Sequence, residues 1–420
     1  MSGKAPRGVR LVIALAGRRN AGKSSLINAL TGQETAIVSD TPGTTTDPVA
    51  KHYELLPLGP VTFYDTAGLD DEGELGALRV KATRKVLYRC DVAVIVLGEE
   101  GFTDYEKDLL RTIREMDIPH VVAWNKADLR PEEHTPEGLD APFLHVSAAT
   151  GRGVDRLKRR LIDSVPPEYR QERLILGDLI REGDHVVCVV PIDLAAPKGR
   201  LILPQVQVLR EILDCDALGT VVKEREIEAA LLGMRTPPAL VVTDSQVVMS
   251  VAGDVPDDIP LTTFSTLFAR YKGDLDSLVA GASAVDTLKD GDTVLIGEAC
   301  SHHDVADDIG RVKIPRWMAQ YTGRDLNFEV YAGHDFPEDL ERFALVVHCG
   351  ACMLNRTEML RRIAECKRRG VPITNYGVAI SKLQGVLQRV LRPFGVMPNT
   401  ITTPTETPHT ISASKLDNIS

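Results

Sequence analysis

The sequence has no excess of positive charge. It carries 49 Lys and Arg against 59 Asp and Glu, a formal net charge of −10, so the surface as a whole repels phosphate backbones. No local basic face stands out either, which speaks against a nucleic-acid-binding protein. The 43% of hydrophobic residues and 26% of charged residues are typical of a folded globular chain.

Long hydrophobic runs are also missing. The longest, such as Leu11–Ala16, are far too short to span a bilayer. The segment Met1–Ala16 has a basic start and then an apolar run, as a signal peptide does, but a glycine-rich loop follows at once. We interpret the run as a first strand and expect neither a membrane partner nor export.

Cysteines are few and irregularly spaced. An odd number, seven, does not suggest a disulfide framework. We expect the chain to be cytoplasmic, where these thiols stay reduced. At 420 residues the chain is too long for one ordinary core, so two or three domains are expected.

Residues 17–24, Gly-Arg-Arg-Asn-Ala-Gly-Lys-Ser, fit the phosphate-loop motif G-x-x-x-x-G-K-[ST]. The motif follows a predicted strand, Arg10–Ala16, and precedes a helical pattern at Ser25–Leu30, which is the context that it requires. Backbone N–H groups would surround the β-phosphate, Lys23 would reach the β- and γ-phosphates, and Ser24 would bind Mg²⁺. The nucleotide-binding residues predicted here are Gly17, Asn20, Ala21, Gly22, Lys23, Ser24 and Ser25.

Three later segments follow predicted strands and complete a guanine-nucleotide site. In Asp65-Thr-Ala-Gly68, Asp65 would hold Mg²⁺ through water and the Gly68 N–H would face the γ-phosphate. In the run Asn125-Lys126-Ala-Asp128, the Asp128 carboxylate would accept two hydrogen bonds from a guanine edge and would repel adenine. Asp128 therefore predicts GTP as the nucleotide. The last segment, Ser147-Ala148, suits a contact to the guanine O6.

The four motifs, in this order, resemble the translation-factor-like branch of small GTPases over residues 10–165. The segment 39–47 is similar to the first switch of the subgroup that contains tRNA-modification and ribosome-assembly GTPases. That resemblance implies Thr45 as a Mg²⁺ ligand and Asn20 as a K⁺ ligand. Lys23, Thr45 and Gly68 are then the catalytic residues.

Leu69 stands where Ras-like proteins place a water-orienting Gln. Leucine cannot orient water, so intrinsic hydrolysis should be slow unless K⁺ or a partner supplies positive charge. An arginine finger typically accelerates hydrolysis by about 10³–10⁵. The acidic stretch 70–74 could position water instead, or could be a solvated switch loop.

The middle of the chain shows strands and helices but no catalytic or metal-ligand spacing. We expect a small sheet with helices on one side of it. A sheet-rich domain without chemistry suits assembly, so dimerisation is expected. The predicted strands lie at 182–190, 220–223 and 239–243, with helices up to 213 and over 224–233.

In the last third, residues that suit metal binding follow the predicted strands. Cys300 and His302 follow the run 292–299, and His348, Cys349 and Cys352 follow the run 343–347. The carboxyl ends of parallel strands share one edge of a sheet, where ligands bind. Further strands are predicted at 326–331 and 371–374.

Three thiolates without an obligatory fourth ligand suit a 4Fe–4S cube with one open iron. Structural zinc sites usually take four ligands in two short pairs, whereas here 45 residues (303–347) separate C-x-H from H-C-x-x-C. A zinc site and a redox dithiol at Cys349 and Cys352 both remain open on these grounds. Cys90, Cys188, Cys215 and Cys366 are interpreted as core residues.

The C-x-H and H-C-x-x-C pattern behind a GTPase domain is similar to the FeFe-hydrogenase maturation GTPases, the HydF family. The stretches 192–205 and 242–246 are similar to that family as well. The resemblance implies a 4Fe–4S cluster on Cys300, Cys349 and Cys352, with His302 and His348 among the candidates for a fourth ligand. It also implies a scaffold that delivers a diiron precursor to apo-FeFe-hydrogenase, after two radical-SAM maturases have acted.

We therefore expect an α/β protein: a P-loop GTPase domain, a small α/β dimerisation domain and a C-terminal parallel-sheet domain that binds the cluster. The expected cofactors are GTP, Mg²⁺, a 4Fe–4S cluster and K⁺. The competing function is an RNA-directed or ribosome-assembly GTPase with a zinc module. The expected domains are 1–168, 169–265 and 266–402, before a disordered tail at 403–420.

Overall fold

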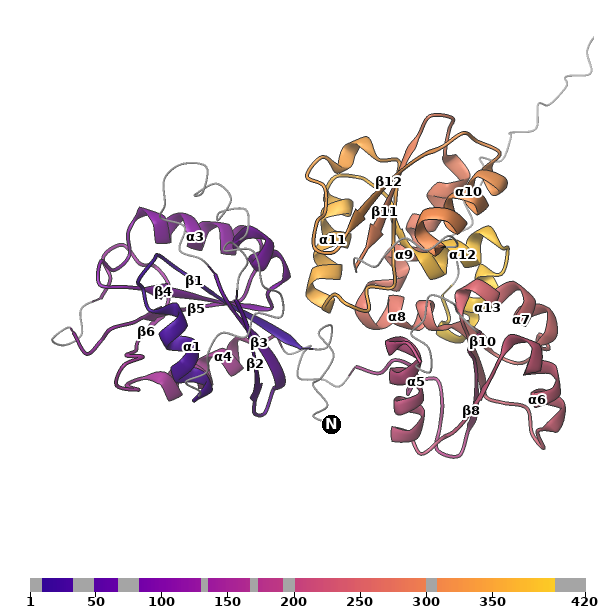
Figure 1. Ribbon diagram of the computed structural model, residues 1–420, viewed down its shortest axis with the longest axis horizontal. Coiled ribbons are helices and arrows are strands. Elements are labelled where there is room, and N and C mark those ends of the chain that lie inside the picture. The colour runs from indigo at the N-terminus through magenta and orange to yellow at the C-terminus, as the bar shows by residue number, and fades with distance from the viewer. Residues whose placement is uncertain are drawn as a thin grey trace, which may run out of the picture.

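A computed structural model describes most of the chain and shows three α/β bodies, each built on its own sheet (Figure 1). The predictions for Thr45, Gly68, Leu69, Cys300 and His302, for the first switch and for the tail lie outside the described residues. No helix in the described part of the chain is long and apolar enough to cross a membrane. The described ranges are 10–32, 49–66, 83–129, 135–166, 173–191, 201–299 and 308–396.

The first body is a P-loop domain on a six-stranded sheet of order β2-β3-β1-β4-β5-β6. β2 runs antiparallel to β3 and the other neighbours are parallel. Its elements are β1 (Leu11–Ala16), α1 (Lys23–Thr31), β2 (Val49–Leu55), β3 (Gly59–Asp65), β4 (Val92–Leu97), α3 (Asp104–Glu115), β5 (His120–Trp124), β6 (Phe143–His145) and α4 (Val154–Ser164).

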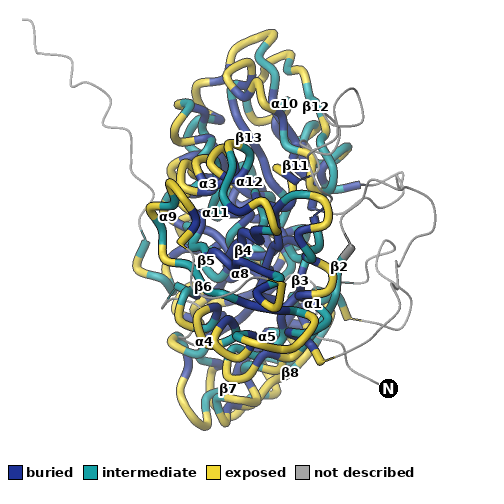
Figure 2. The backbone as a smooth tube through the Cα atoms, turned by 90° about the vertical axis from the view of Figure 1, so that its left-hand side faces the viewer, coloured by how far each residue is buried: buried dark blue, intermediate teal, exposed yellow. Residues whose placement is uncertain are grey.

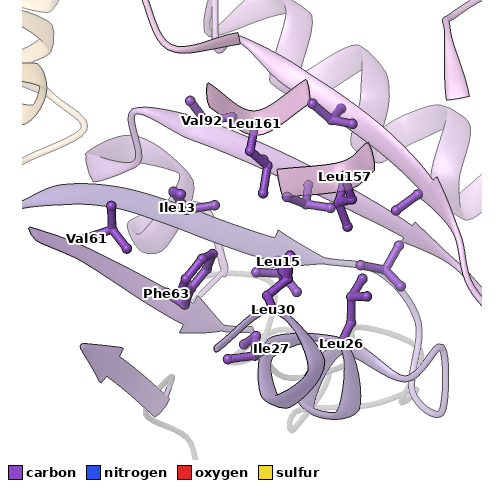
Figure 3. Close-up of a cluster of buried hydrophobic side chains, with 14 of the residues drawn as sticks. Ile13, Leu15, Leu26, Ile27, Leu30, Val61, Phe63, Val92, Leu157 and Leu161 are labelled. Carbon is purple, nitrogen blue, oxygen red and sulfur yellow. The ribbon is translucent and has the colours of Figure 1, made fainter. Parts of the chain in front are cut away.

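The central strands of this sheet are apolar throughout because both of their faces are covered. All six residues of β1 are buried, and alternate side chains enter two different cores. Ile13 and Leu15 pack against α1 and α4 (Figure 3), whereas Ala14 and Ala16 pack toward α3. This double burial fixes β1 at the centre of the sheet and places the phosphate loop at its carboxyl end.

The second body is a parallel four-stranded sheet of order β10-β9-β7-β8. The predicted strands and helices are present, but the prediction of helices on one side only is wrong. Val186 and Cys188 of the β7 strand pack under α5 and α8, while Val187 and Val189 pack under α6 and α7. The elements are β7 (His185–Val189), α5 (Leu203–Asp214), β8 (Leu218–Val222), α6 (Ile227–Gly233), β9 (Leu240–Thr243), α7 (Val248–Asp254), β10 (Leu261–Thr263) and α8 (Phe264–Lys272).

The third body is a four-stranded sheet of order β12-β11-β13-β14. All its neighbouring strands are parallel, as predicted, and its central strands are buried between helical layers, with exposed residues on the outer helix faces (Figure 2). Its elements are α9 (Leu275–Ala282), β11 (Thr293–Glu298), α10 (Ile314–Thr322), β12 (Asn327–Ala332), β13 (Leu345–His348), α11 (Arg356–Arg368), β14 (Ile373–Asn375), α12 (Tyr376–Leu383) and α13 (Leu387–Leu391).

The α11 helix joins the third body to the P-loop domain, which it faces in Figure 1. The Arg361 guanidinium donates hydrogen bonds of 2.8–2.9 Å to the carbonyls of Leu87, Tyr88 and Cys90. At the start of the helix, the Asn355 amide donates to the Arg89 carbonyl at 2.8 Å. The segment just before β4 is therefore held by the helix that follows the H-C-x-x-C motif.

Candidate functional site

The phosphate loop turns sharply between β1 and α1, and two of its glycines are required by close contacts. A Cβ at Gly17 would lie 2.3 Å from the Val96 carbonyl oxygen, and one at Gly22, which has a φ of +86°, would lie 2.3 Å from the Asn125 amide nitrogen. Asn20 stands exposed between them with a φ of +60°. The loop therefore has the open, tightly curved backbone that a phosphate group needs.

The side chains predicted to meet the phosphates and Mg²⁺ lie together at the end of β1. The Lys23 ammonium donates to the carbonyls of Gly17 at 2.8 Å and Arg18 at 2.7 Å, so it lies folded over the loop. The Ser24 hydroxyl donates to the Asp65 carboxylate at the end of β3. This pair brings together the two oxygen groups that were predicted to hold Mg²⁺ directly and through water.

Asn125 links the phosphate loop to the guanine loops. Its amide nitrogen donates to the Ala21 carbonyl at 2.9 Å, and its amide oxygen accepts from the Ala148 N–H at 3.0 Å. Ser147 is buried and donates through its hydroxyl to the Asp128 carboxylate, which is exposed. The residues predicted for base recognition thus share one wall, with Asp128 open to a ligand.

Lys126 lies beside this wall in a left-handed conformation, with a φ of +60°. Its ammonium pairs with the Glu99 carboxylate at 2.7 Å. The ion pair holds the side chain of Lys126, which is the residue next to Asn125. All the described residues that were predicted for GTP therefore gather at the carboxyl edge of the first sheet.

Cys349 and Cys352 lie at the corresponding edge of the third sheet. Cys349 directly follows β13, and its N–H donates to the Gly297 carbonyl of β11 at 2.7 Å. In return, the Ala299 N–H donates to the Cys349 sulfur at 3.0 Å. Since Cys300 is the next residue after Ala299, the chain enters the undescribed segment right beside the Cys349 thiol.

His348 is directed into the interior rather than toward the two cysteines. It is fully buried, its Nδ1 donates to the Cys349 carbonyl at 2.9 Å and its Nε2 accepts from Arg362 at 2.8 Å. Burial, aided by the Arg362 charge, lowers the pKa of His348 to about 3. Both ring nitrogens are occupied in a neutral imidazole, and this geometry is against the suggested role of His348 as an iron ligand.

Arg362 is the centre of a buried polar network that sequence reasoning missed. It is fully buried and bonds the Glu358 carboxylate at 2.9 Å and the Gly333 carbonyl at 3.0 Å, besides His348. Glu358 in turn accepts from the Nδ1 of His334 at 3.0 Å. The network ties the loop after β12 to the end of β13. The i,i+4 spacing of Glu358 and Arg362 was visible in the sequence, but their burial was not.

Three other described cysteines lie buried in the cores. Burial raises the pKa of the Cys90, Cys188 and Cys366 thiols to about 12 in each case, so these thiols stay protonated and unreactive. Within the described ranges, no three His, Cys, Asp or Glu side chains are grouped so that they could hold a metal ion. Cys300 and His302, two of the predicted ligands, fall in the undescribed segment 300–307.

Comparisons with known proteins match the first domain to GTPases. Residues 12–126 match a family model described as "50S ribosome-binding GTPase". The chain is 37% identical over 164 residues to GTPase Der of Nautilia profundicola and 36% identical over 159 residues to the tRNA modification GTPase MnmE of Prochlorococcus marinus. Each match covers 36% of this chain, and the chain spans about a third of each relative's length, 35% and 34%.

A solved structure, the G domain of the T. maritima FeoB iron transporter, is also similar to the chain. It is 26% identical, covers 39% of this chain and 99% of its own, and has a TM-score of 0.30. A score this low carries no further inference. Domain assignment therefore rests on the family models.

The other two bodies match two further family models. Residues 175–273 match the "Hydrogen maturase F dimerization domain", and residues 276–393 match the "Hydrogen maturase F tetramerization domain". These matches coincide with the second and third sheets and come behind the GTPase domain. The chain has the three-domain architecture of the hydrogen maturase F family, HydF, and belongs to that family.

Proposed function

We propose that this protein matures FeFe-hydrogenase: it holds a 4Fe–4S cluster on its third domain, carries a diiron precursor and delivers it to the apo-enzyme. The observation that supports it best is the placing of Cys349 and Cys352 at the carboxyl edge of a parallel sheet, in the domain that matches the HydF tetramerization model. The two radical-SAM maturases are proposed as partners that act before delivery.

The described donors fit such a cluster. Ala299, the residue before Cys300 in the sequence, donates its N–H to the Cys349 sulfur, and we infer that Cys300, Cys349 and Cys352 share the cluster. His302 follows Cys300 by two residues and is our candidate for the fourth position. When bound, the cluster supplies an iron with an exchangeable position. The protein would supply the three thiolates. The hydrogen bonds between Ala299, Cys349 and Gly297 fix the strand ends from which the thiolate-bearing loops begin.

We propose that the GTPase domain binds GTP and Mg²⁺ and acts as a switch for the third domain. The β1 strand, which leads into the phosphate loop, is bonded to Asp91 through the Val12 N–H at 2.6 Å. The Asp91 carboxylate also accepts from the Thr357 hydroxyl in the first turn of α11. A movement of β1 on nucleotide exchange would thus reach the helix that begins behind the H-C-x-x-C loop.

Hydrolysis is proposed to be slow and to depend on K⁺, because Asn20 is exposed at the tip of the phosphate loop and Leu69 cannot orient water. Turnover of GTP should be faster in KCl than in NaCl at equal ionic strength. Equal rates in both salts over a full titration would remove K⁺ from the proposed cofactors.

We propose a homodimer through the second domain, with β8 as the contact. β8 is an edge strand in the described sheet, and its side chains Leu218 and Val221 are 59% and 45% exposed. An exposed apolar edge invites pairing with a second strand. Lysine at both positions should shift sedimentation toward a smaller species.

We retain 1–168, 169–265 and 266–402 as proposed domain boundaries. We also propose that the chain works in the cytoplasm, because a reducing compartment keeps its seven irregularly spaced cysteines as thiols.

The delivery function is tested by activation of apo-FeFe-hydrogenase. Protein expressed with the two radical-SAM maturases and then purified should confer hydrogen evolution on the apo-enzyme, and the Cys349→Ser variant should not. Cys215→Ser, which changes a cysteine of the second domain, is the control. Failure of loaded wild-type protein to activate, together with tight zinc and no iron, would favour the RNA-directed GTPase with a zinc module.

A further inference from the structure

A buried lysine at the end of α8 lies beneath the cysteine loop. Lys272 is the last residue of α8 and is only 2% exposed. Its ammonium donates to the carbonyls of Ala351 at 2.9 Å, Cys352 at 3.1 Å and Leu354 at 2.8 Å. One side chain therefore holds the turn that carries Cys352.

The turn that Lys272 binds contains a residue in a strained backbone conformation. Ala351 is buried and has a φ of +53°, a conformation that costs a non-glycine residue about 1–2 kcal/mol. Arg356, at the start of α11, donates in the opposite direction to the carbonyls of Tyr271 at 3.1 Å and Gly273 at 2.8 Å. The end of α8 and the cysteine loop are thus joined by two reciprocal cations.

The charge of Lys272 is not balanced by an acid in the described structure. Its hydrogen bonds there are all to main-chain carbonyls, which carry no full negative charge. Keeping an unpaired cation in an interior is costly, so an anion is expected beside it.

We propose that Lys272 is a positioning residue and the counter-charge for an anionic metal–thiolate group on Cys349 and Cys352. The proposal rests on the proposed function where that group is a 4Fe–4S cluster. Three thiolates make such a cluster an anion, and reduction adds one more negative charge. A buried cation beside the group should therefore raise its reduction potential, because net charge and surroundings set that potential.

The first test is an EPR-monitored redox titration of the reconstituted full-length protein. Lys272→Met and Lys272→Gln remove the charge, and Lys272→Arg keeps it; Gln still donates to the carbonyls and serves where Met prevents folding. The midpoint potential should fall in the Met and Gln variants and stay near the wild-type value in the Arg variant. Lys289→Met, at an exposed lysine of the third domain, should change nothing.

An effect on loop structure alone would look different. It would lower the iron content of all three variants and leave the potential of the remaining clusters unchanged, and that result would overturn the counter-charge. GTP turnover serves as the folding control, because Lys272 lies outside the nucleotide site.

A second probe separates this proposal from the proposed function. Wild-type protein that took up no iron would contradict the cluster but not the counter-charge. Cd²⁺ is then titrated into metal-free protein and followed by thiolate-to-metal absorbance. Lys272→Met and Lys272→Gln should weaken Cd²⁺ binding ~10–100-fold, as loss of an outer-shell partner does. Equal affinity in wild type and both variants would overturn the role of Lys272.

Discussion

The nucleotide site and the cysteine loop occupy equivalent places in two parallel sheets, but they are built differently. At the nucleotide site, the recognising groups come from short loops directly after strands and bond one another, as Ser24 bonds Asp65 and Asn125 bonds Ala148. At the cysteine loop, buried charges from helices hold the neighbouring chain: Lys272 from α8 donates to carbonyls of the loop, and Arg362 from α11 donates to His348. A motif can specify the first kind of site alone, whereas the second kind depends on tertiary packing.

The largest effect that this difference predicts is on stability. Arg362→Met leaves the Glu358 carboxylate, 3% exposed, without its buried cation. Breaking a buried pair in this way typically costs about 3–5 kcal/mol. Urea unfolding should show that loss in the transition of the third domain, whereas Arg368→Met, at a side chain 71% exposed, should stay within about 0.5 kcal/mol of wild type.

A change at the nucleotide site should strongly slow GTP turnover but leave the cysteine loop intact. Lys23→Ala removes the ammonium folded over the phosphate loop, and loss of such a charge-stabilising donor typically slows catalysis by about 10²–10³. GTP hydrolysis should fall by that factor, while iron uptake stays as in wild type. Lys107→Ala, on the surface of α3, is the matched control. A parallel loss of iron would show that the two sites are not independently built.

The choice of nucleotide should depend on one carboxylate. Asp128→Asn turns an acceptor into a mixed donor and acceptor, and losing a charged hydrogen bond typically costs about 1.5–3 kcal/mol. Titration calorimetry should show that the variant binds GTP more weakly, and xanthosine nucleotides more tightly, than wild type does. GTP affinity equal to that of wild type would contradict the guanine assignment.

A smaller effect is expected where the two domains meet. Asp91 is 2% exposed and accepts from the donors Val12 N–H and Thr357 O–H. Asp91→Asn places an NH₂ group against a donor, which typically costs about 1–3 kcal/mol. For this variant, differential scanning calorimetry should show separate unfolding transitions for the P-loop domain and the third domain. Asp108→Asn, on the exposed face of α3, should melt as wild type does.

The sequence predicts most of the parallel strands because their apolar runs are buried on both faces. It misses β10, which has only three residues, Leu261–Thr263, and the antiparallel β2, whose Val49–Leu55 contains a lysine, a histidine and a glutamate. These two are edge strands in the described sheets, where apolar patterning is weakest. The predictions also leave out β4, Val92–Leu97, although it is a buried apolar strand in the middle of its sheet.

The sequence predicts the nucleotide site better than the cysteine loop, because a motif records neighbouring residues and not the tertiary packing around them. The described residues of the GTP motifs lie together at the carboxyl edge of the first sheet. His348 does not follow its motif, because neighbouring residues along a strand point to opposite faces and its ring enters the interior beside Arg362. Lys272 gave no signal at all: it stands 77 residues before Cys349 (349 − 272 = 77), and only the packing of α8 brings it under the loop.

The most direct test of the cluster is anaerobic reconstitution with iron and sulfide, followed by elemental analysis and EPR of the reduced protein. Wild type should hold four irons and four sulfides per chain on the proposed ligands and give the signal of a reduced 4Fe–4S cluster. Cys300→Ser, Cys349→Ser and Cys352→Ser should each lose that signal or leave a three-iron species, with GTP turnover retained. One tightly bound zinc per chain, and no iron signal after reconstitution, would contradict the account.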